Sequence, residues 1–293
     1  MKKILVTGGN GQLGSSLKSL SKFNANFKLI FTDVQELDIT SEEKVSEFLD
    51  KDKYYAIINC AAYTAVDKAE SDKDLACLLN TQAPKFLSIQ ASKRGIKLIH
   101  ISTDYVFDGK KNTPLKPSDN TLPNSIYGLT KLEGEKNIIK YCSSGFIIIR
   151  TSWLYSEFGN NFLNTMLRLG SEKETLNVVY DQVGTPTFAR DLAKTIITSL
   201  EHIQEDTKRI FHFSNEGVCS WYDFARKIMS LSKLDCKINP ILSTQYPTPA
   251  PRPSYSVLDK TDIKEFLNIE IPYWEDALIE CIETIRVLKS KSR

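Results

Sequence analysis

The amino terminus carries a short apolar run followed at once by three evenly spaced glycines. Lys3–Thr7 reads as a strand that leads into Gly8-Gly-Asn-Gly11-Gln-Leu-Gly14, after which leucines recur at helical spacing. Strand, glycine turn and helix in this order are the context of a dinucleotide fingerprint, in which the backbone approaches a pyrophosphate at the positive end of the helix. The alternative is a plain glycine-rich turn. The candidate cofactor-binding residues of this stretch are Gly8, Gly11, Gln12, Leu13 and Gly14.

Strands and helices alternate through the first half of the chain. Apolar runs of strand length, separated by segments with helical spacing, are Lys3–Thr7, Phe27–Phe31, Tyr54–Asn59, Ile96–Ile101 and Phe146–Arg150. The helical segments include residues 67–80 and a helix from about Ile126 to Tyr141, and Thr40–Glu43 reads as a capping box. Because parallel strands need crossover connections, this alternation predicts an α/β protein with a Rossmann-type doubly wound parallel sheet.

The pattern changes after Arg150. We expect residues 1–152 to form the dinucleotide-binding domain and residues 153–293 to form mainly a smaller α/β substrate lobe, with some segments returning to the first domain. This half is expected to hold short helices and an isolated strand at Ile210–Phe213, and the proline-rich Tyr246–Pro253 excludes a helix there. The basic end Lys289–Arg293 reads as a frayed tail.

Charge and composition exclude several functional classes. The 293 residues carry a formal net charge of only +2, with both signs interleaved, so the basic stripe of a nucleic-acid-binding protein is missing. The apolar run after Lys2 and Lys3 is too short for a signal peptide and no run reaches the length of a membrane span, so a cytoplasmic location is expected. The six cysteines and three histidines show no metal-ligand spacing, so we expect no metal site and only structural or surface histidines.

Acidic residues follow the second predicted strand. Asp33 lies about 20 residues after the glycine turn, where a carboxylate accepts hydrogen bonds from ribose hydroxyls and repels a 2′-phosphate. The residues after it, Val34-Gln-Glu36, and the glycine turn contain no Lys or Arg, so we expect NADH to be used at least as well as NADPH. Asp38 and Ile39 are candidates to lie along the adenine, with a turn-capping carboxylate as the equal alternative for Asp38.

The central stretch Ile101–Gly109, together with Tyr127 and Lys131, brings the candidate chemistry. Thr103 is expected at the carboxyl end of a buried strand, where open α/β sheets bind their ligands. Tyr127 and Lys131 are four residues apart in a predicted helix and therefore share a face. A Lys ammonium beside a phenol lowers its pKa, which makes a usable proton donor and acceptor. The pair alone would read as an ordinary solvated helix face; with Thr103 it predicts proton transfer to a carbonyl.

Several longer motifs carry a resemblance that covers nearly the whole chain. They are Thr7–Gly14, Ala61–Glu70, Ser102–Gly109, Arg150–Tyr155, Asp181–Thr187 and Arg252–Asp259. With these motifs the chain resembles the dTDP-4-dehydrorhamnose reductases of the extended short-chain dehydrogenase/reductase superfamily. The resemblance implies reduction of the C4 ketone of dTDP-4-dehydro-L-rhamnose to dTDP-L-rhamnose, an activated sugar for surface polysaccharide, with NADH or NADPH as hydride donor.

The resemblance also implies roles for individual residues. Tyr127 is the implied proton donor, Thr103 holds the carbonyl oxygen, and Lys131 lowers the Tyr pKa and binds the nicotinamide ribose. The implied cofactor contacts are Gly11, Gln12, Leu13, Asp33, Asp38, Ile39, Ala62, Tyr63 and Thr64. The implied positions near the substrate sugar are Asp104, Tyr105 and Trp153. We expect Trp153 to lie against the sugar or thymidine, with packing inside the lobe as the alternative.

Two departures from the family pattern matter. Some members use an acidic residue of the first helix in a Mg-dependent dimer contact, but Ser15 and Ser16 occupy that region here, which puts a metal-bridged dimer in question and leaves monomer and homodimer open. Dehydratases of the superfamily commonly carry Thr-Asp-Glu where this chain has Tyr105, which favours a reductase. The alternatives are another nucleotide-deoxysugar 4-ketoreductase or epimerase, or a non-catalytic nucleotide-binding regulatory subunit.

Overall fold

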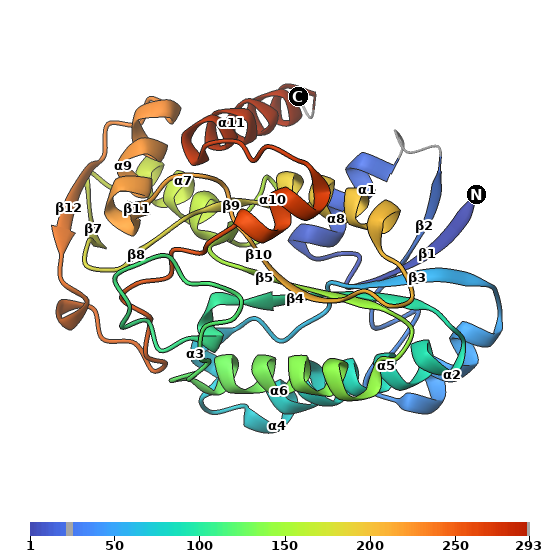
Figure 1. Ribbon diagram of the computed structural model, residues 1–293. Helices are drawn as coiled ribbons and strands as arrows, with labels where there is room; N and C mark the ends of the chain where they lie inside the picture. The colour runs from blue at the N-terminus through green and yellow to red at the C-terminus, as the bar shows by residue number, and fades with distance from the viewer. Residues whose placement is uncertain (22–25, 292–293) are drawn as a thin grey trace.

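A six-stranded parallel sheet lies at the centre of the computed structural model, which describes residues 1–21 and 26–291. Its strands are β1 (Lys2–Thr7), β2 (Phe27–Thr32), β3 (Tyr54–Asn59), β4 (Lys97–Thr103), β5 (Phe146–Thr151) and β10 (Lys208–Phe213). Their order is β10-β5-β4-β3-β1-β2, so β1 has only β2 on one side, and the chain adds β3, β4, β5 and β10 in turn on the other side (Figure 1). The predicted doubly wound parallel sheet is confirmed.

Helices cover both faces of this sheet because its strands carry apolar side chains on both. On one face Ile4 and Val6 pack with α1 (Gln12–Leu20), α8 (Ala189–His202) and α10 (Thr261–Leu267). On the other face Leu5 packs with α2 (Glu42–Asp50), α5 (Ala83–Lys93) and α6 (Ile126–Tyr141) (Figure 1). Alternate residues of one strand thus serve two cores, as expected of a buried parallel strand.

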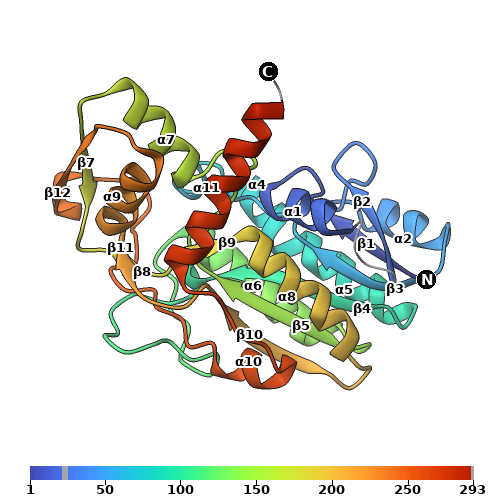
Figure 2. The ribbon, with the colours of Figure 1, turned by 90° about the horizontal axis from the view of Figure 1, so that it is seen from above.

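A second apolar cluster lies beside the sheet and is formed by the carboxyl-terminal half of the chain. It is built from α7 (Phe162–Glu172), α9 (Trp221–Ser232) and α11 (Trp274–Lys291). The short paired strands of this half are β6 (Leu154–Tyr155) with β9 (Thr187–Phe188), β7 (Thr175–Val179) with β12 (Lys237–Ile241), and β8 (Val183–Gly184) with β11 (Cys219–Ser220). Seen from above, α7, α9, β7 and β12 stand to one side of the sheet, with α11 between them and α8 (Figure 2).

The strand expected to be isolated at Ile210–Phe213 is not isolated. As β10 it pairs in parallel with β5 and forms the edge of the central sheet. Its apolar side chains Phe211 and Phe213 belong to the same core as α8 and α10. Residues 189–213 and 261–271 therefore pack with the amino-terminal sheet, although they follow segments of the second cluster in sequence.

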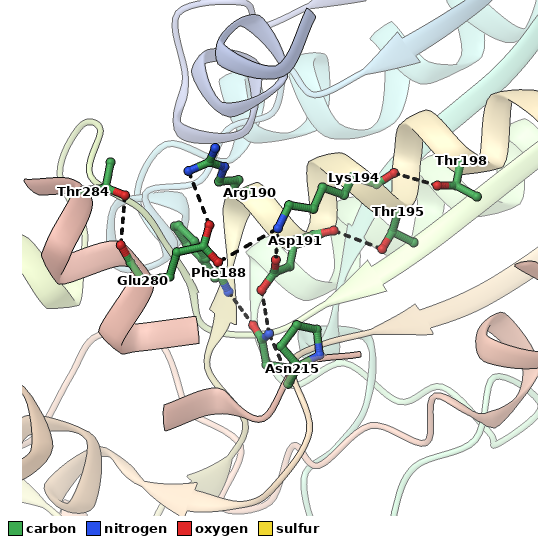
Figure 3. A network of polar contacts seen from close by, with 10 residues as sticks. Phe188, Arg190, Asp191, Lys194, Thr195, Thr198, Asn215, Glu280 and Thr284 are labelled. Carbon is green, nitrogen blue, oxygen red and sulfur yellow. Dashed lines mark hydrogen bonds and ion pairs between the residues drawn. The ribbon is translucent and has the colours of Figure 1, made fainter. Parts of the chain in front are cut away.

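A polar network ties the segment after β10 to its surroundings. The buried Asn215 donates to Asp191 Oδ2 on α8 at 2.9 Å and to the carbonyl of Pro272, just before α11, at 3.2 Å. Arg190 pairs with Glu280 of α11 at 3.3 Å (Figure 3). The sheet-covering helix α8 and the lobe helix α11 are thus joined by directed bonds.

Other predicted elements differ in detail. The helix expected over residues 67–80 is divided into α3 (Val66–Ala69), α4 (Lys73–Cys77) and a π-helical turn at Leu78–Gln82. The capping box expected at Thr40–Glu43 is wrong, because Ser41 caps α2 by accepting from Lys44 N–H. Residues 289–291 continue α11 instead of fraying, and residues 292–293 of the expected tail lie outside the described part. No helix of residues 1–21 and 26–291 has the length and apolar character to cross a membrane.

Candidate active site

The glycine turn after β1 has no room for side chains at two positions. Gly8 has φ +66°, in the left-handed region, and a Cβ there would meet the backbone of Ala61 at 2.7 Å. A Cβ on Gly14 would meet the carbonyl oxygen of Gly8 at 2.3 Å, so α1 packs directly on the turn. Helix α1 begins at Gln12, and its unpaired N–H groups and positive dipole end lie at this turn. The arrangement fits a pyrophosphate cradle.

Asp33 lies at the end of β2 beside this cradle. Its Oδ2 accepts from the backbone N–H of Asn10, inside the glycine turn, at 3.1 Å, and its Oδ1 accepts from Val34 N–H at 2.9 Å. The structure therefore brings the carboxylate to the turn, as the sequence predicts. Each oxygen keeps a further lone pair for a ribose hydroxyl.

Asp38 and Ile39 are engaged by the protein itself. Asp38 Oδ1 accepts from the Thr40 hydroxyl and N–H, and Oδ2 pairs with Lys44 at 3.0 Å. The Thr40 hydroxyl, followed by Lys44, lowers the pKa of Asp38 below 3.8. Ile39 is buried in the core under α2. These contacts favour the turn-capping alternative for Asp38, and its role toward adenine stays a prediction.

The loop that holds Ala62, Tyr63 and Thr64 is fixed by a buried amide. Asn80 Oδ1 accepts from Tyr63 N–H at 2.9 Å, and Asn80 Nδ2 donates to the Tyr63 carbonyl at 3.1 Å. The same Nδ2 contacts the hydroxyl of Thr130 on α6 at 3.2 Å. Asn80 thereby links the third strand's loop to the helix that carries Tyr127. Sequence patterns do not single out Asn80, because nothing local to a helical segment marks an amide that bonds a distant loop.

Thr103 and Tyr127 meet at the carboxyl end of β4. Thr103 is the last residue of β4, and Ser125 caps α6 so that Tyr127 stands in its first turn. The Thr103 hydroxyl donates to Asp104 Oδ1 at 3.0 Å and accepts from Tyr105 N–H at 3.2 Å. The rings of Tyr105 and Tyr127 meet edge to face, with centroids 5.5 Å apart.

The expected lowering of the Tyr127 pKa is wrong for this structure. Burial raises the pKa of Tyr127 above its usual value of 10, and the neighbouring Thr103 hydroxyl offsets only part of that rise. Lys131 does not counteract it, because its Nζ donates to the carbonyl of Ile101 at 2.6 Å and lies 3.4 Å from His100 Nε2. Lys131 is itself only 2% exposed, and burial lowers its pKa to about 8.

Asp104 and Tyr105 continue the site toward the carboxyl-terminal half. Burial raises the pKa of Asp104 to about 6, although the hydroxyls of Thr103 and Ser256 favour its ionised form. The Tyr105 hydroxyl accepts from Arg252 at 3.2 Å, and Arg252 forms a 2.6 Å ion pair with Asp67. Arg252 and Asp67 lie within two of the motifs noted above, yet only the fold shows that these motifs meet.

Trp153 packs against another aromatic side chain. Its indole stacks on Trp221 of α9, with centroids 3.6 Å apart and an interplanar angle of 11°, and its backbone has φ 49°. A Cβ on Gly184 would meet the same indole at 2.9 Å. These contacts favour the alternative that Trp153 packs inside the lobe, and its contact with the substrate sugar stays a prediction.

A groove of about 810 Å³ lies nearby, between Val183, Cys219 and Tyr222. None of the predicted site residues lines it.

Known proteins match this chain over nearly its whole length. The family model described as RmlD substrate binding domain matches residues 1–287. A dTDP-4-dehydrorhamnose reductase of Aggregatibacter actinomycetemcomitans is 40% identical over 95% of this chain and 97% of its own length. A dTDP-4-keto-6-deoxy-D-glucose reductase of Streptomyces niveus is 34% identical over 98% of both chains.

Solved structures agree with these sequence matches. The crystal structure of a dTDP-4-dehydrorhamnose reductase from Clostridium acetobutylicum superposes with a TM-score of 0.92 at 42% identity, covering 97% of this chain and 99% of that one. A dTDP-4-dehydrorhamnose reductase of Bacillus anthracis in complex with NADP gives a TM-score of 0.91 at 36% identity, covering 97% and 100%.

Proposed function

The chain belongs to the dTDP-4-dehydrorhamnose reductase family, and from that premise we propose that it reduces the C4 ketone of dTDP-4-dehydro-L-rhamnose to the alcohol of dTDP-L-rhamnose. The observation that carries the proposal is the grouping of Thr103, Tyr127 and Lys131 at the carboxyl end of β4. A hydroxyl, a phenol and an amine at this edge of a parallel sheet are the groups that a carbonyl reduction needs beside a hydride donor.

NADH or NADPH supplies the hydride when bound, and the residues present fit such a cofactor. The test of fit is the turn after β1, where added Cβ atoms at Gly8 and Gly14 would collide with backbone and where α1 offers free N–H groups. In this proposal the turn residues hold the pyrophosphate, Asp33 accepts from ribose hydroxyls, and the loop at 62–64 lies along the nicotinamide side.

The side chains of the site then divide the work on the ketone oxygen. Tyr127 donates its phenolic proton to the oxygen as negative charge develops there, and a raised pKa keeps this proton in place at neutral pH. Thr103 turns its hydroxyl from Asp104 Oδ1, to which it donates in this structure, to the same oxygen. Lys131, buried one turn further along α6, is the cation that binds the nicotinamide ribose in this proposal.

The competing functions would use some of the same residues. The relative from Streptomyces niveus, which is named for a different dTDP-4-keto sugar, supports a sister 4-ketoreductase as the second candidate. An epimerase or a dehydratase would need a further acid or base, and the residue after Asp104 is Tyr105, whose pKa burial raises to about 12. A regulatory subunit would bind the nucleotide without turnover.

One assay separates these outcomes. The protein is incubated with enzymatically generated dTDP-4-dehydro-L-rhamnose and NADH or NADPH, and the sugar product is identified by mass spectrometry. Turnover of another dTDP-4-keto sugar, with none of this one, would assign a sister reductase; cofactor binding with no turnover of either would assign a regulatory role.

The same assay measures cofactor choice. From Asp33 we expect kcat/KM with NADH to equal or exceed that with NADPH. A tenfold preference for NADPH, about 1.4 kcal/mol in transition-state binding, would mean that a distant basic group reaches the 2′-phosphate.

A further inference from the structure

A line of buried polar side chains runs beneath the site and ends at Lys131. Thr7 at the end of β1 bonds Asn59 at the end of β3 over 2.7 Å, and the Asn59 amide lies 3.0 Å from His100 Nδ1 on β4. The other ring nitrogen of His100, Nε2, lies 3.4 Å from Lys131 Nζ. Thr7, Asn59, His100 and Lys131 are each at most 2% exposed. The line therefore crosses the three neighbouring strands β1, β3 and β4 almost fully shielded from solvent.

Lys131 has few other polar neighbours. Its Nζ donates to the carbonyl of Ile101 at 2.6 Å. The titratable groups that act on it electrostatically are Glu135, one turn further on α6, and Cys60 after β3. Glu135 is already held in a buried ion pair with Arg150 at 2.7 Å. Among the described residues, His100 and the Ile101 carbonyl are thus the groups within hydrogen-bonding distance of the amine.

We propose that His100 is a positioning residue for Lys131: it holds the amine from below, and Asn59 and Thr7 fix the imidazole in turn. A protonated lysine has three N–H donors. With the Ile101 carbonyl and His100 taking two of them, one remains for the groups of the active site. This inference rests on the function proposed above, in which Lys131 acts on the reaction.

The side chains of Thr7, Asn59 and His100 can form a complete set of hydrogen bonds with Lys131 in either of its ionisation states. When Lys131 is charged, Nε2 accepts from it, Nδ1–H donates to the Asn59 oxygen, and the Asn59 amide group donates to Thr7. When Lys131 is neutral, Nε2–H donates to the amine, Nδ1 accepts from the Asn59 amide group, and Thr7 donates to the Asn59 oxygen. Conversion of one pattern to the other takes rotation of the Asn59 amide and the Thr7 hydroxyl together with a change of the His100 tautomer from Nδ1–H to Nε2–H, and either pattern leaves these groups bonded.

His212 provides a matched control. It is the other histidine buried at 0% exposure in the same sheet, on β10, and its Nδ1 bonds the Leu115 carbonyl at 2.9 Å. Burial lowers the pKa of both imidazoles. Replacement of either by Phe removes a buried ring nitrogen pair from the sheet, but only one of the two touches Lys131.

The test compares His100→Phe with His212→Phe in two measurements. The first is titration of the Lys131 Cε resonance by NMR in cofactor-free protein, assigned by its loss in Lys131→Met. A hydrogen bond to a charged group is worth more than one to a neutral group, so His100→Phe should lower the midpoint by about 1 pH unit while His212→Phe leaves it unchanged. The second is steady-state kinetics, where His100→Phe should lower kcat about tenfold with the sugar KM within about twofold.

If His100→Phe does not fold, the variants His100→Gln and His100→Asn test the same proposal. Gln places a polar group near the position of Nε2 and should restore both midpoint and kcat, whereas Asn places one near Nδ1 and should not. Equal behaviour of the two variants would overturn the proposal, as would a parental midpoint in His100→Phe or the same shift in His212→Phe. If the parent protein turns over no sugar, the proposed function fails, and the NMR titration still decides the role of His100.

Discussion

Burial controls the ionisation of individual side chains in this site more strongly than neighbouring charge does. It raises the pKa of Tyr127, raises that of Asp104 to about 6 and lowers that of Lys131 to about 8. In each case the neutral form is favoured. The sequence gives these residue types and their spacing but not how deeply each side chain is buried. For this reason the predicted lowering of the Tyr127 pKa is wrong.

Replacement of Tyr127 by Phe is expected to lower kcat by about 10² to 10⁴, the range for losing a positioned general acid. Cofactor affinity should change little, because the ring remains in place. Steady-state kinetics and cofactor titration measure the two effects. Tyr141→Phe, at the far end of the same helix, is the control and should behave as the parent. Near-parental turnover by Tyr127→Phe would remove this residue from the mechanism.

Asp104 is expected to make stability depend on pH. Its pKa of about 6 lies above the ordinary 3.8, so the folded protein binds an extra proton between these values and loses stability as pH rises through them. Asp104→Asn removes this titration. Its free energy of unfolding relative to the parent should therefore increase by roughly 1 to 2 kcal/mol from pH 5 to pH 7.5. Chemical denaturation at both pH values measures this, and a constant difference would contradict it.

Trp153 combines a strained backbone with a stacked side chain. Its φ of 49° suits glycine, whereas its indole is stacked on Trp221. Both Trp153→Gly and Trp153→Ala lose the stack, but only Ala keeps the strain. We expect the Gly variant to be the more stable of the two by about 1 kcal/mol, measured by thermal or chemical unfolding. The reverse order would show that the left-handed conformation relaxes once the indole is gone.

At the scale of elements, the spacing of apolar residues predicts the bounds of a strand or helix correctly where that element is uninterrupted. β3 at Tyr54–Asn59 and α6 at Ile126–Tyr141 have the bounds that their apolar patterns predict. The prediction fails at residues 67–80. The helix is interrupted at Ser71 and Asp72, and after α4 it continues as a π-helical turn at Leu78–Gln82. Within that turn Asn80 bonds the loop at Tyr63, a contact that local helix propensity does not predict.

The junction between the glycine turn and α1 is expected to tolerate no added methyl group at Gly14. A Cβ there would lie 2.3 Å from the Gly8 oxygen and 2.7 Å from Gly9 Cα, both backbone atoms that cannot move alone. Gly14→Ala should therefore lower Tm by several degrees and weaken cofactor binding. At Gly11, where φ is −72° and the nearest atom would be 3.4 Å away, Ala should leave Tm close to that of the parent. Equal Tm values for the two variants would refute the packing argument.

At the scale of the molecule, two apolar clusters are interlaced rather than arranged in series: the first is the core that α1, α8 and α10 form with the sheet, and the second is the cluster of α7, α9 and α11. The chain leaves the first cluster after β5, contributes α7 to the second, returns with α8 and β10, and finally ends in α11. Local patterns predicted most of these helices, but they could not assign β10 to the central sheet, because parallel pairing depends on residues far apart in sequence. The same limit applies to the site, where Arg252 meets Tyr105 and His100 meets Lys131 only in the fold.

Interlacing predicts that the two clusters unfold together. All three tryptophans of the chain, Trp153, Trp221 and Trp274, pack in or against the second cluster, so their fluorescence reports on it, whereas far-UV circular dichroism reports on both. The two denaturation curves should coincide in the parent. Asn215→Ala, which removes the bonds from Asn215 to Asp191 and Pro272, should shift the fluorescence midpoint to lower denaturant than the dichroism midpoint. Separate transitions in the parent would support the simple division at residue 152.

The position of β10 at the edge of the sheet also bears on how the protein is made. During translation β5 emerges with one side paired to β4 and the other side open, since its second partner follows roughly 60 residues later. At roughly 5 to 20 residues per second, the ribosome needs about 3 to 12 seconds to deliver that partner. For this interval the nascent chain presents the open edge of the apolar strand segment Phe146–Ile149, which is the kind of surface that chaperones shield from aggregation.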